Sequence, residues 1–298
     1  MNQELIGKVI SPEELLVEYP DREFYRLTNN EECHRKFHYK TGINTDILPF
    51  NPDGECKSGG LYFFHASQIP SYDSYCSDVY YIRKVSFTPE SRIYAEEGKF
   101  KTNEFVLGER EKFNIQDFLD GYFEKDTDNR IRLCIYQNSY ALRYIKIQTE
   151  EICKLAVQQN GYALRYVEIQ TEEICKLAVQ QNGYALCYVE IQTDEICKLA
   201  VQQYGRALCY VKNRTDEICK LAVQQNGHAL EFVKNQTEEI CKIAVQKYGR
   251  ALCYVENQTE EICKMAVQQD GLFLQFVKNQ TREICKIAIQ QINLLQNM

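Results

Sequence analysis

The sequence predicts an α+β N-terminal domain over residues 1–126, followed over residues 127–298 by an all-α solenoid of 22-residue helix-turn-helix repeats. The solenoid is indicated by the segment TEEICKLAVQQNGYALRYVEIQ, which recurs along the second part of the chain with a constant spacing of 22 residues. The N-terminal domain is indicated by a change of composition, because this part holds the prolines and several short β-type runs.

One threonine and one cysteine in each copy mark the repeat register. The regular copies begin at Thr149, Thr171, Thr193, Thr215, Thr237, Thr259 and Thr281. An earlier copy begins at Thr127 and has the polar Arg130 where the others have isoleucine, and the last copy has Asn293 where the others have glycine. Terminal copies of a stack need atypical sequences, so we expect about eight repeats with 127–148 and 281–298 as caps.

Each repeat is expected to fold as two helices. Thr149 suits the N-cap of the first helix, and Glu150 suits its positive end and lies four residues before Lys154. Gly161 stands where a helix needs a left-handed residue after its C-terminus, and a shorter apolar helix follows. A unit of this size buries too few aliphatic side chains to offset its conformational entropy, so the repeats must stack on one another.

The cysteines of the repeats are expected to be small, buried packing residues with free thiols. Equivalent positions in stacked helices lie about 8–10 Å apart, which is beyond disulfide reach and does not converge on a metal ion. We therefore predict no metal site. The second helix carries Cys187, Cys209 and Cys253 at a position where other copies have arginine, glutamate or glutamine, so these three are expected to be exposed or half-exposed.

Two rows of positions vary between the copies and are the candidate partner-binding residues. The first row carries aromatic and cationic side chains, and the second alternates between glutamate and lysine. The candidates are Tyr162, Tyr184, Arg206, His228 and Arg250 in the first row, and Glu168, Lys212 and Lys234 in the second. Variable aromatic and charged rows on a constant core are typical of a protein-binding platform. The alternative is a solvated face that varies neutrally on a spacer.

Composition excludes several functional classes. The formal net charge of −7 lacks the excess of basic residues that a dedicated nucleic-acid binder needs. No apolar run has the roughly 18–20 residues of a membrane span, and the N-terminus carries acids, unlike a signal peptide. We therefore expect a soluble, cytosolic protein with no nucleic-acid partner, no membrane partner and no cofactor.

The N-terminal domain contains four runs that predict strands, at residues 24–27, 60–64, 79–85 and 104–107. The string YRLTNNEECHRKFHYKTGINTDILPFNPDGECKSGGLYFF, followed by YYIRKVSFTPESRIY, resembles the N-terminal domain attached to ankyrin and other repeat arrays in giant, mimivirus-like amoebal viruses. The repeats themselves resemble short two-helix repeats of the same viruses. This resemblance implies a scaffold that binds a host or viral protein in the host cytoplasm, with packaging in the virion and homodimerisation left open.

The N-terminal domain also shows a fainter resemblance to ADP-ribosyltransferases, on YRLT, GLYF and NEFV. This similarity implies an alternative function, an NAD-dependent transferase whose substrate is recruited by the solenoid. Arg26 and Thr28 would then hold NAD, Tyr62 would stack on the nicotinamide, and Glu104 would bond the ribose and steady the transition state. In the main interpretation, Tyr62 belongs to the core, Glu104 is a charge at a strand edge, and no residue is catalytic.

Overall fold

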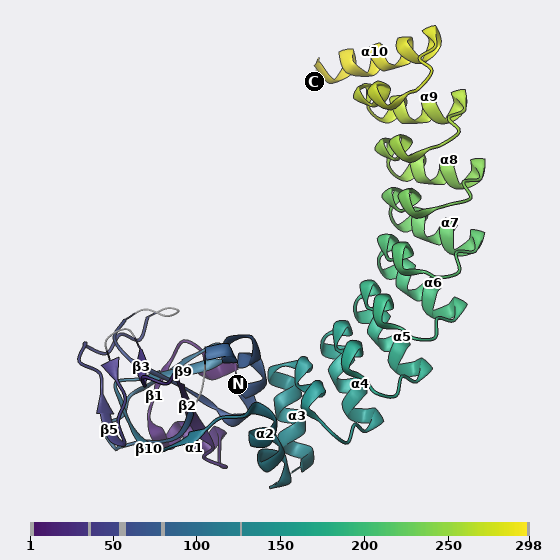
Figure 1. The fold of residues 1–298 in the computed structure, drawn as a ribbon. Coiled ribbons are helices and arrows are strands. Elements are labelled where there is room, and N and C mark those ends of the chain that lie inside the picture. Colours follow the sequence, from purple (N-terminus) through teal and green to yellow (C-terminus); the bar gives the residue numbers. More distant parts are fainter. Residues whose placement is uncertain (1–2, 35–36, 54–57, 79–80, 126, 297–298) are drawn as a thin grey trace. The chain divides into compact units, whose positions relative to one another are not determined.

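The computed structural model describes residues 3–34, 37–53, 58–78, 81–125 and 127–296. It confirms the predicted fold class, with a sheet-rich N-terminal part followed by regularly spaced helical repeats (Figure 1). The chain divides into two compact units, Met1–Ile147 and Gln148–Met298. This division lies one helix pair after the boundary expected at residue 127, because α3 (Thr127–Gln137) packs against α2 (Ile115–Glu124) and η2 (Ala66–Asp78).

The first unit is built on an eight-stranded sheet with the order β1-β8-β9-β6-β2-β7-β10-β5. Its strands are β1 (Val9–Ile10), β2 (Phe24–Thr28), β5 (Gly42–Thr45), β6 (Leu61–His65), β7 (Tyr81–Ser86), β8 (Ile93–Glu96), β9 (Lys99–Thr102) and β10 (Glu104–Lys112). Each strand pairs antiparallel with the strand next to it in this order. β3 (Cys33–His34) and β4 (Phe37–His38) pair antiparallel in a separate two-stranded sheet. The remaining helices are η1 (Gln3–Leu5), α1 (Pro12–Glu18) and η3 (Ser139–Tyr144).

The core of the first unit is aromatic. Phe24, Phe63, Phe100 and Phe105 are all buried, and they meet in edge-on or stacked contacts 5.3–6.4 Å apart. Leu15 of α1 packs into the same cluster. The four predicted strands are confirmed as parts of β2, β6, β7 and β10, although residues 79 and 80 of one prediction lie outside the described residues.

The second unit repeats one motif, an α-helix followed by a six-residue 3-10 helix, and Figure 1 shows the two kinds of helix stacked in two layers. The motif begins with α4 (Glu150–Gln159) and η4 (Gly161–Tyr166). The later copies are α5 (Glu172–Gln181) and η5 (Gly183–Tyr188), α6 (Asp194–Gln203) and η6 (Gly205–Tyr210), α7 (Asp216–Gln225) and η7 (Gly227–Phe232), α8 (Glu238–Lys247) and η8 (Gly249–Tyr254), α9 (Glu260–Gln269) and η9 (Gly271–Phe276), and α10 (Arg282–Gln296). In α10 the helix runs past Asn293, where a regular copy would turn.

The predicted start of each first helix is confirmed. Thr149 accepts a hydrogen bond from the backbone N–H of Ile152, and the equivalent threonines cap the following helices in the same way. Lys154 pairs with Glu150 in its own helix at 3.1 Å and with Glu173 of the next repeat at 2.7 Å. These surface pairs add little stability each, but they keep the first turns of successive helices in register.

The prediction of a left-handed Gly161 is wrong. The α-helix ends at Asn160, which is extended, with φ −149° and ψ 111°, and Gly161 opens the 3-10 helix without a positive φ. Glycine is needed for another reason, because a Cβ at this position would lie 2.4 Å from the carbonyl oxygen of Ala178 in the next repeat. The glycine row therefore permits close contact between repeats rather than an unusual backbone.

The array core consists of the same small and branched residues in every repeat. In the first copy Ile152, Cys153, Ala156 and Val157 are buried, each no more than 3% exposed, with Ala163 and Leu164 of the 3-10 helix fully buried beside them. The cysteines at equivalent positions up to Cys263 are buried to the same extent. The prediction that these cysteines are buried packing residues is confirmed up to Cys263, whereas Cys285 of the last copy is half-buried.

A glutamine that is not among the residues predicted from the sequence joins neighbouring repeats by hydrogen bonds. The side chain of Gln148 donates from Nε2 to the carbonyl oxygen of Tyr166 at 2.8 Å, and its Oε1 accepts from the backbone N–H of Glu168 at 3.1 Å. Oε1 also accepts from Sγ of Cys153 at 3.6 Å. We call this arrangement the amide clamp. It recurs at Gln170, Gln192, Gln236 and Gln258.

Removal of one amide clamp should destabilise the array. In Gln170→Ala, the Tyr188 carbonyl and the Glu190 N–H lose their partner, so the free energy of unfolding should fall by about 1–3 kcal/mol. Gln180→Ala removes an exposed glutamine of α5 and should change it by less than about 0.5 kcal/mol. Urea titration followed by circular dichroism measures both values. Equal effects of the two substitutions would contradict the clamp.

Candidate partner-binding surface

The first variable row lies at the second residue of each 3-10 helix, where each side chain packs on an aromatic ring of the next repeat. Tyr162 meets Tyr188 edge-on at 6.0 Å, and Tyr184 meets Tyr210 at the same distance. The remaining members make equivalent contacts: Arg206 over Phe232 at 5.3 Å, His228 on Tyr254 at 5.9 Å and Arg250 over Phe276 at 5.9 Å. The row is therefore an interlocked ladder, half-buried except at the exposed Arg250.

Two further tyrosines extend this ladder at alternate repeats. Tyr204 and Tyr248 occupy the N-cap of a 3-10 helix, where other copies have Asn160 or its equivalents, and neither makes the side-chain cap bond. Tyr204 packs on Tyr184 at 4.6 Å and remains 45% exposed, and Tyr248 packs on His228 at 4.5 Å. Neither tyrosine is among the residues predicted from the sequence, although the replacement of the capping asparagine is a signal visible there.

We call the middle of this ladder the tyrosine surface. It consists of Tyr184, Tyr204, Arg206, Tyr210, His228 and Tyr248. Burial, together with the charges of Arg206 and Arg250, lowers the pKa of His228, so this imidazole is neutral at pH 7. Its buried Nδ1 has no hydrogen-bond partner within the described part of the chain. The surface thus combines exposed aromatic area with one guanidinium and a neutral imidazole.

The second variable row is exposed. Glu168, Lys212 and Lys234 follow the 3-10 helices, and their side chains lie on the surface. The amide clamps bind the backbone N–H groups of Glu168 and Lys212. The backbone of this loop is therefore fixed, while the side chain at this position varies between copies. Lys212 also donates from Nζ to the Glu190 carbonyl at 3.0 Å.

The residues of the transferase interpretation lie in the sheet of the first unit. Arg26 donates from Nη1 to the Tyr62 carbonyl at 2.9 Å, so the structure brings these two together, and Thr28 is buried further along β2. The ring of Tyr62 has the ammonium groups of Lys99 and Lys101 within 4.8 and 5.6 Å. These cations occupy the surroundings in which a positively charged nicotinamide would have to stack.

Glu104 opens β10, and two strands, β2 and β7, separate β10 from β6 in the sheet order. Its carboxylate accepts hydrogen bonds from the hydroxyls of Thr88 at 2.5 Å and Thr45 at 3.4 Å. These contacts tie β10 to β5 and to the segment that follows β7. The catalytic role of Arg26, Thr28, Tyr62 and Glu104 stays a prediction.

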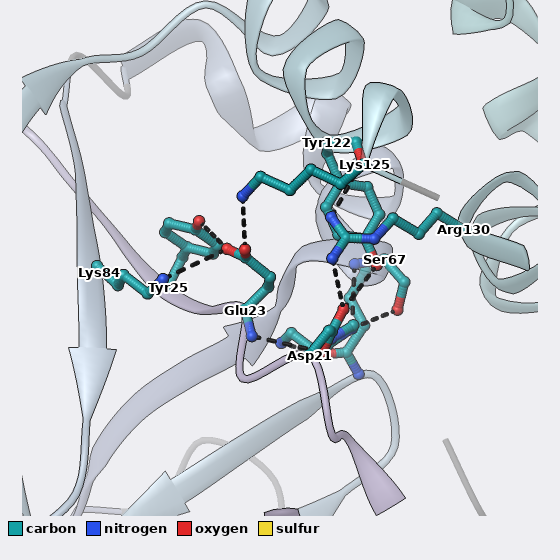
Figure 2. A network of polar contacts seen from close by, with 10 residues as sticks. Asp21, Glu23, Tyr25, Ser67, Lys84, Tyr122, Lys125 and Arg130 are labelled. Carbon is teal, nitrogen blue, oxygen red and sulfur yellow. Dashed lines mark hydrogen bonds and ion pairs between the residues drawn. The ribbon is translucent and has the colours of Figure 1, made fainter. Parts of the chain in front are cut away.

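The first unit also contains a partly buried polar network around Asp21 and Glu23 (Figure 2). Asp21 accepts from Nε2 of His65 at 2.8 Å, and Nδ1 of His65 lies 2.9 Å from Oγ of Ser67. This serine–histidine–aspartate order resembles a hydrolytic triad, but Ser67 and His65 are both 0% exposed. The backbone N–H of Ser67 also donates to Nδ1, so the serine is held in a local turn. The arrangement is therefore structural.

Basic residues complete the same network. Arg130 of α3 lies 3.6 Å from Asp21, which explains why this copy has arginine in place of isoleucine. Lys125 pairs with Glu23 at 2.7 Å, and Figure 2 shows Tyr25 and Lys84 converging on the same carboxylate. Burial raises the pKa of Asp21 and of Glu23, but hydrogen bonds and nearby cations outweigh burial and hold both pKa values below their usual range.

Among the described residues, no three histidine, cysteine, aspartate or glutamate side chains are grouped so that they could hold a metal ion. None of the helices in the described ranges is both long enough and apolar enough to span a membrane.

The polar network should make the first unit sensitive to acid. Since the pKa values of Asp21 and Glu23 are depressed by folding, their contribution is present above about pH 4 and is lost as pH falls through the folded-state pKa. Asp21→Asn should lower stability at pH 7 by about 1–3 kcal/mol and weaken the acid dependence. Scanning calorimetry between pH 7 and pH 3 measures both effects. Glu31→Gln, at an exposed position, is the control, and an acid profile of Asp21→Asn identical to wild type would contradict the assignment.

Thiol reactivity should follow position in the repeat. Burial raises the pKa of Cys153 and Cys175 to about 11, whereas Cys187 and Cys253 lie exposed on the 3-10 helices and Cys209 is half-exposed, as predicted. Iodoacetamide at pH 8, with sites mapped by mass spectrometry, should modify Cys187 and Cys253 before Cys153 and Cys175, because alkylation needs an accessible thiolate. Equal rates for Cys175 and Cys187 would show that the repeats open locally.

The repeats are similar to those of known proteins. Residues 149–193, 171–215, 193–237 and 215–258 each match a family model described as "Domain of unknown function (DUF4116)". Successive matches are shifted by the length of one repeat. No solved structure matches the chain.

Two curated proteins of Acanthamoeba polyphaga mimivirus are similar to parts of the chain. "Putative ankyrin repeat protein R868" is 32% identical over 92 residues, which is 28% of this chain and 44% of that protein. "Uncharacterized protein R869" is 41% identical over 51 residues, which is 16% of this chain and 37% of that protein. The chain thus spans less than half the length of these relatives. These similarities confirm the predicted resemblance to repeat proteins of a mimivirus.

Proposed function

We propose that the protein is a non-enzymatic interaction protein that binds a host or viral protein through the tyrosine surface of its repeat array. The observation that carries this proposal is the exposure of Tyr204, Tyr210 and Tyr248, at 45%, 43% and 39%, beside Arg206 on a core of constant residues. Tyrosine and arginine are enriched among residues that dominate binding energy at protein interfaces.

Packing of the tyrosine surface favours binding. Tyr204 and Tyr248 are each held on one side by a ring of the preceding repeat, so their side chains have already lost part of their rotational freedom. A partner that covers them gains the buried area at a reduced cost in entropy. The replacement of a stabilising asparagine cap by tyrosine at these positions is difficult to explain as neutral variation.

The relatives support the same class of function. One of them is named as an ankyrin repeat protein, and stacked repeat arrays commonly bind proteins through rows of surface side chains. We therefore propose that the protein acts in the cytoplasm of the infected host, with a host or viral protein as partner. The Glu168, Lys212 and Lys234 row, on a different part of the repeat, would then adjust specificity by charge.

Affinity capture from infected host cells tests this proposal with variants that preserve the fold. Tyr204→Asn with Tyr248→Asn introduces the residue that caps other repeats, so the array should remain intact while its exposed aromatic area is lost. Binding of a protein that wild type captures stoichiometrically should weaken at least about tenfold. Gln180→Ala with Gln224→Ala, at exposed positions of α5 and α7, is the matched control. Unchanged capture by the tyrosine variant would contradict the proposal.

A further inference from the structure

A cavity of about 130 Å³ lies between two successive loops of the array. It is lined by Lys212, Arg214, Asp216, Cys219, Lys234 and Asn235. A cavity of about 360 Å³ occurs two repeats later at the equivalent position, lined in part by Glu256, Gln258, Glu260, Cys263, Lys278 and Asn279. The fold therefore forms this groove between repeats, and the sequence of each copy decides its chemistry. We call the first cavity the basic groove.

The basic groove lies at the one regular junction whose amide clamp is replaced by another residue. Arg214 occupies the position of Gln170 and Gln192, and it donates to the carbonyls of Leu208 and Cys209, both at 3.1 Å. A guanidinium has no acceptor atom. The N–H of Lys234 and the thiol of Cys219 are the counterparts of groups that donate to the clamp oxygen in other repeats, so here they lack that oxygen.

Both of these donors belong to residues that line the basic groove. Cys219 is only 3% exposed, so its thiol has little access to bulk water in place of the missing acceptor. Lys234 supplies an ammonium group as well as its backbone N–H. The groove therefore presents donors at the place where the other repeats supply a carbonyl-type oxygen.

Charge distinguishes the basic groove from its counterparts. Its lining carries three cations, Lys212, Arg214 and Lys234, against the single carboxylate of Asp216. The lining of the later groove carries the carboxylates of Glu256 and Glu260 against one cation, Lys278. At the junction before α5, the equivalent residues Glu168, Glu172 and Glu190 are all acidic. An anion is therefore favoured at the basic groove and disfavoured at the others.

We propose that the basic groove binds a phosphate group. One phosphate oxygen takes the place of the missing clamp oxygen and accepts from the Lys234 N–H and the Cys219 thiol. The side chains of Lys212, Arg214 and Lys234 balance its charge, and after Asp216 is counted the excess of cations suits a dianion better than a carboxylate. The volume of about 130 Å³ is well below that of pockets for drug-sized ligands, so the groove holds a single phosphate group, and the rest of any molecule that carries it would lie outside.

Isothermal titration of the full chain with inorganic phosphate, at constant ionic strength, tests the site. Arg214→Gln restores the clamp residue of other repeats, and Lys234→Glu introduces the residue found at position 168, so both variants suit the fold. Each should weaken phosphate binding at least about tenfold. Lys286→Gln, at an exposed position of α10, removes the same charge as Arg214→Gln and should leave binding unchanged.

Thermal unfolding without phosphate provides a second readout. Arg214→Gln should raise the unfolding midpoint because a clamp is restored, and phosphate should raise the midpoint of wild type but not of this variant. No phosphate binding by wild type, or equal weakening by Lys286→Gln, would overturn the proposal.

The source of the phosphate group is resolved with a phosphoserine peptide and its unphosphorylated form. Tighter binding of the phosphopeptide than of inorganic phosphate, lost in Arg214→Gln, would assign the groove to a phosphorylated partner chain. Equal affinity would assign it to the free anion. Both results support a phosphate site, and neither depends on the tyrosine surface, so the two proposals can fail separately.

Discussion

The contact between one repeat and the next is the constraint on which the array depends. A ten-residue α-helix and a six-residue 3-10 helix are too short to be stable alone, so each pair must bury its surface on its neighbour. Gly161 permits the approach, since any side chain there would collide with the Ala178 carbonyl. Gln148 then fixes it by bonding the carbonyl of Tyr166, at the end of the following 3-10 helix, and the N–H of Glu168 just after it. Gly161 and Gln148 therefore have separate roles, since the first permits the close contact and the second supplies hydrogen bonds across it.

The surface can vary while the fold stays constant because different positions form the two. The positions that join the repeats are apolar, small or amide side chains, and they hardly change from copy to copy. The side chains of the ladder also contact the next repeat, but rings and cations can both pack on the facing aromatic ring. Tyr184 can therefore be replaced by Arg206 or His228 with a new ring contact in its place. A constant frame with an adjustable surface suits recognition of another protein.

The sequence predicted the parts of the fold that follow from periodicity and from local capping. Thr149 as N-cap, the strand at Phe24 and the buried Cys153 are of this kind, because each depends on neighbouring residues. The parts that it did not predict depend on contacts between repeats. The pattern predicts a left-handed residue at Gly161 because the sequence does not show how closely Ala178 approaches. The amide clamp joins residues about 20 positions apart.

The candidate surface was predicted in part for the same reason. Variation between copies predicts Tyr162 and its equivalents. The packing of Tyr204 on Tyr184 depends on the distance between stacked repeats, which does not follow from the sequence. In the first unit, the sequence marked Arg130 as unusual without giving its reason, which is the carboxylate of Asp21 more than 100 residues earlier. Resemblance to mimivirus repeat proteins supplied the class of protein but none of these contacts.

Amide hydrogen exchange of the full chain, resolved to single residues and carried out without phosphate, tests the central claim most directly. If glutamine clamps join the repeats, the N–H groups of Glu168, Glu190 and Lys212 should exchange slowly, because each is bound by a clamp oxygen. The N–H of Lys234, whose clamp position is occupied by Arg214, should exchange faster than all three. Equal protection at Lys234 and at the clamped positions would contradict the account.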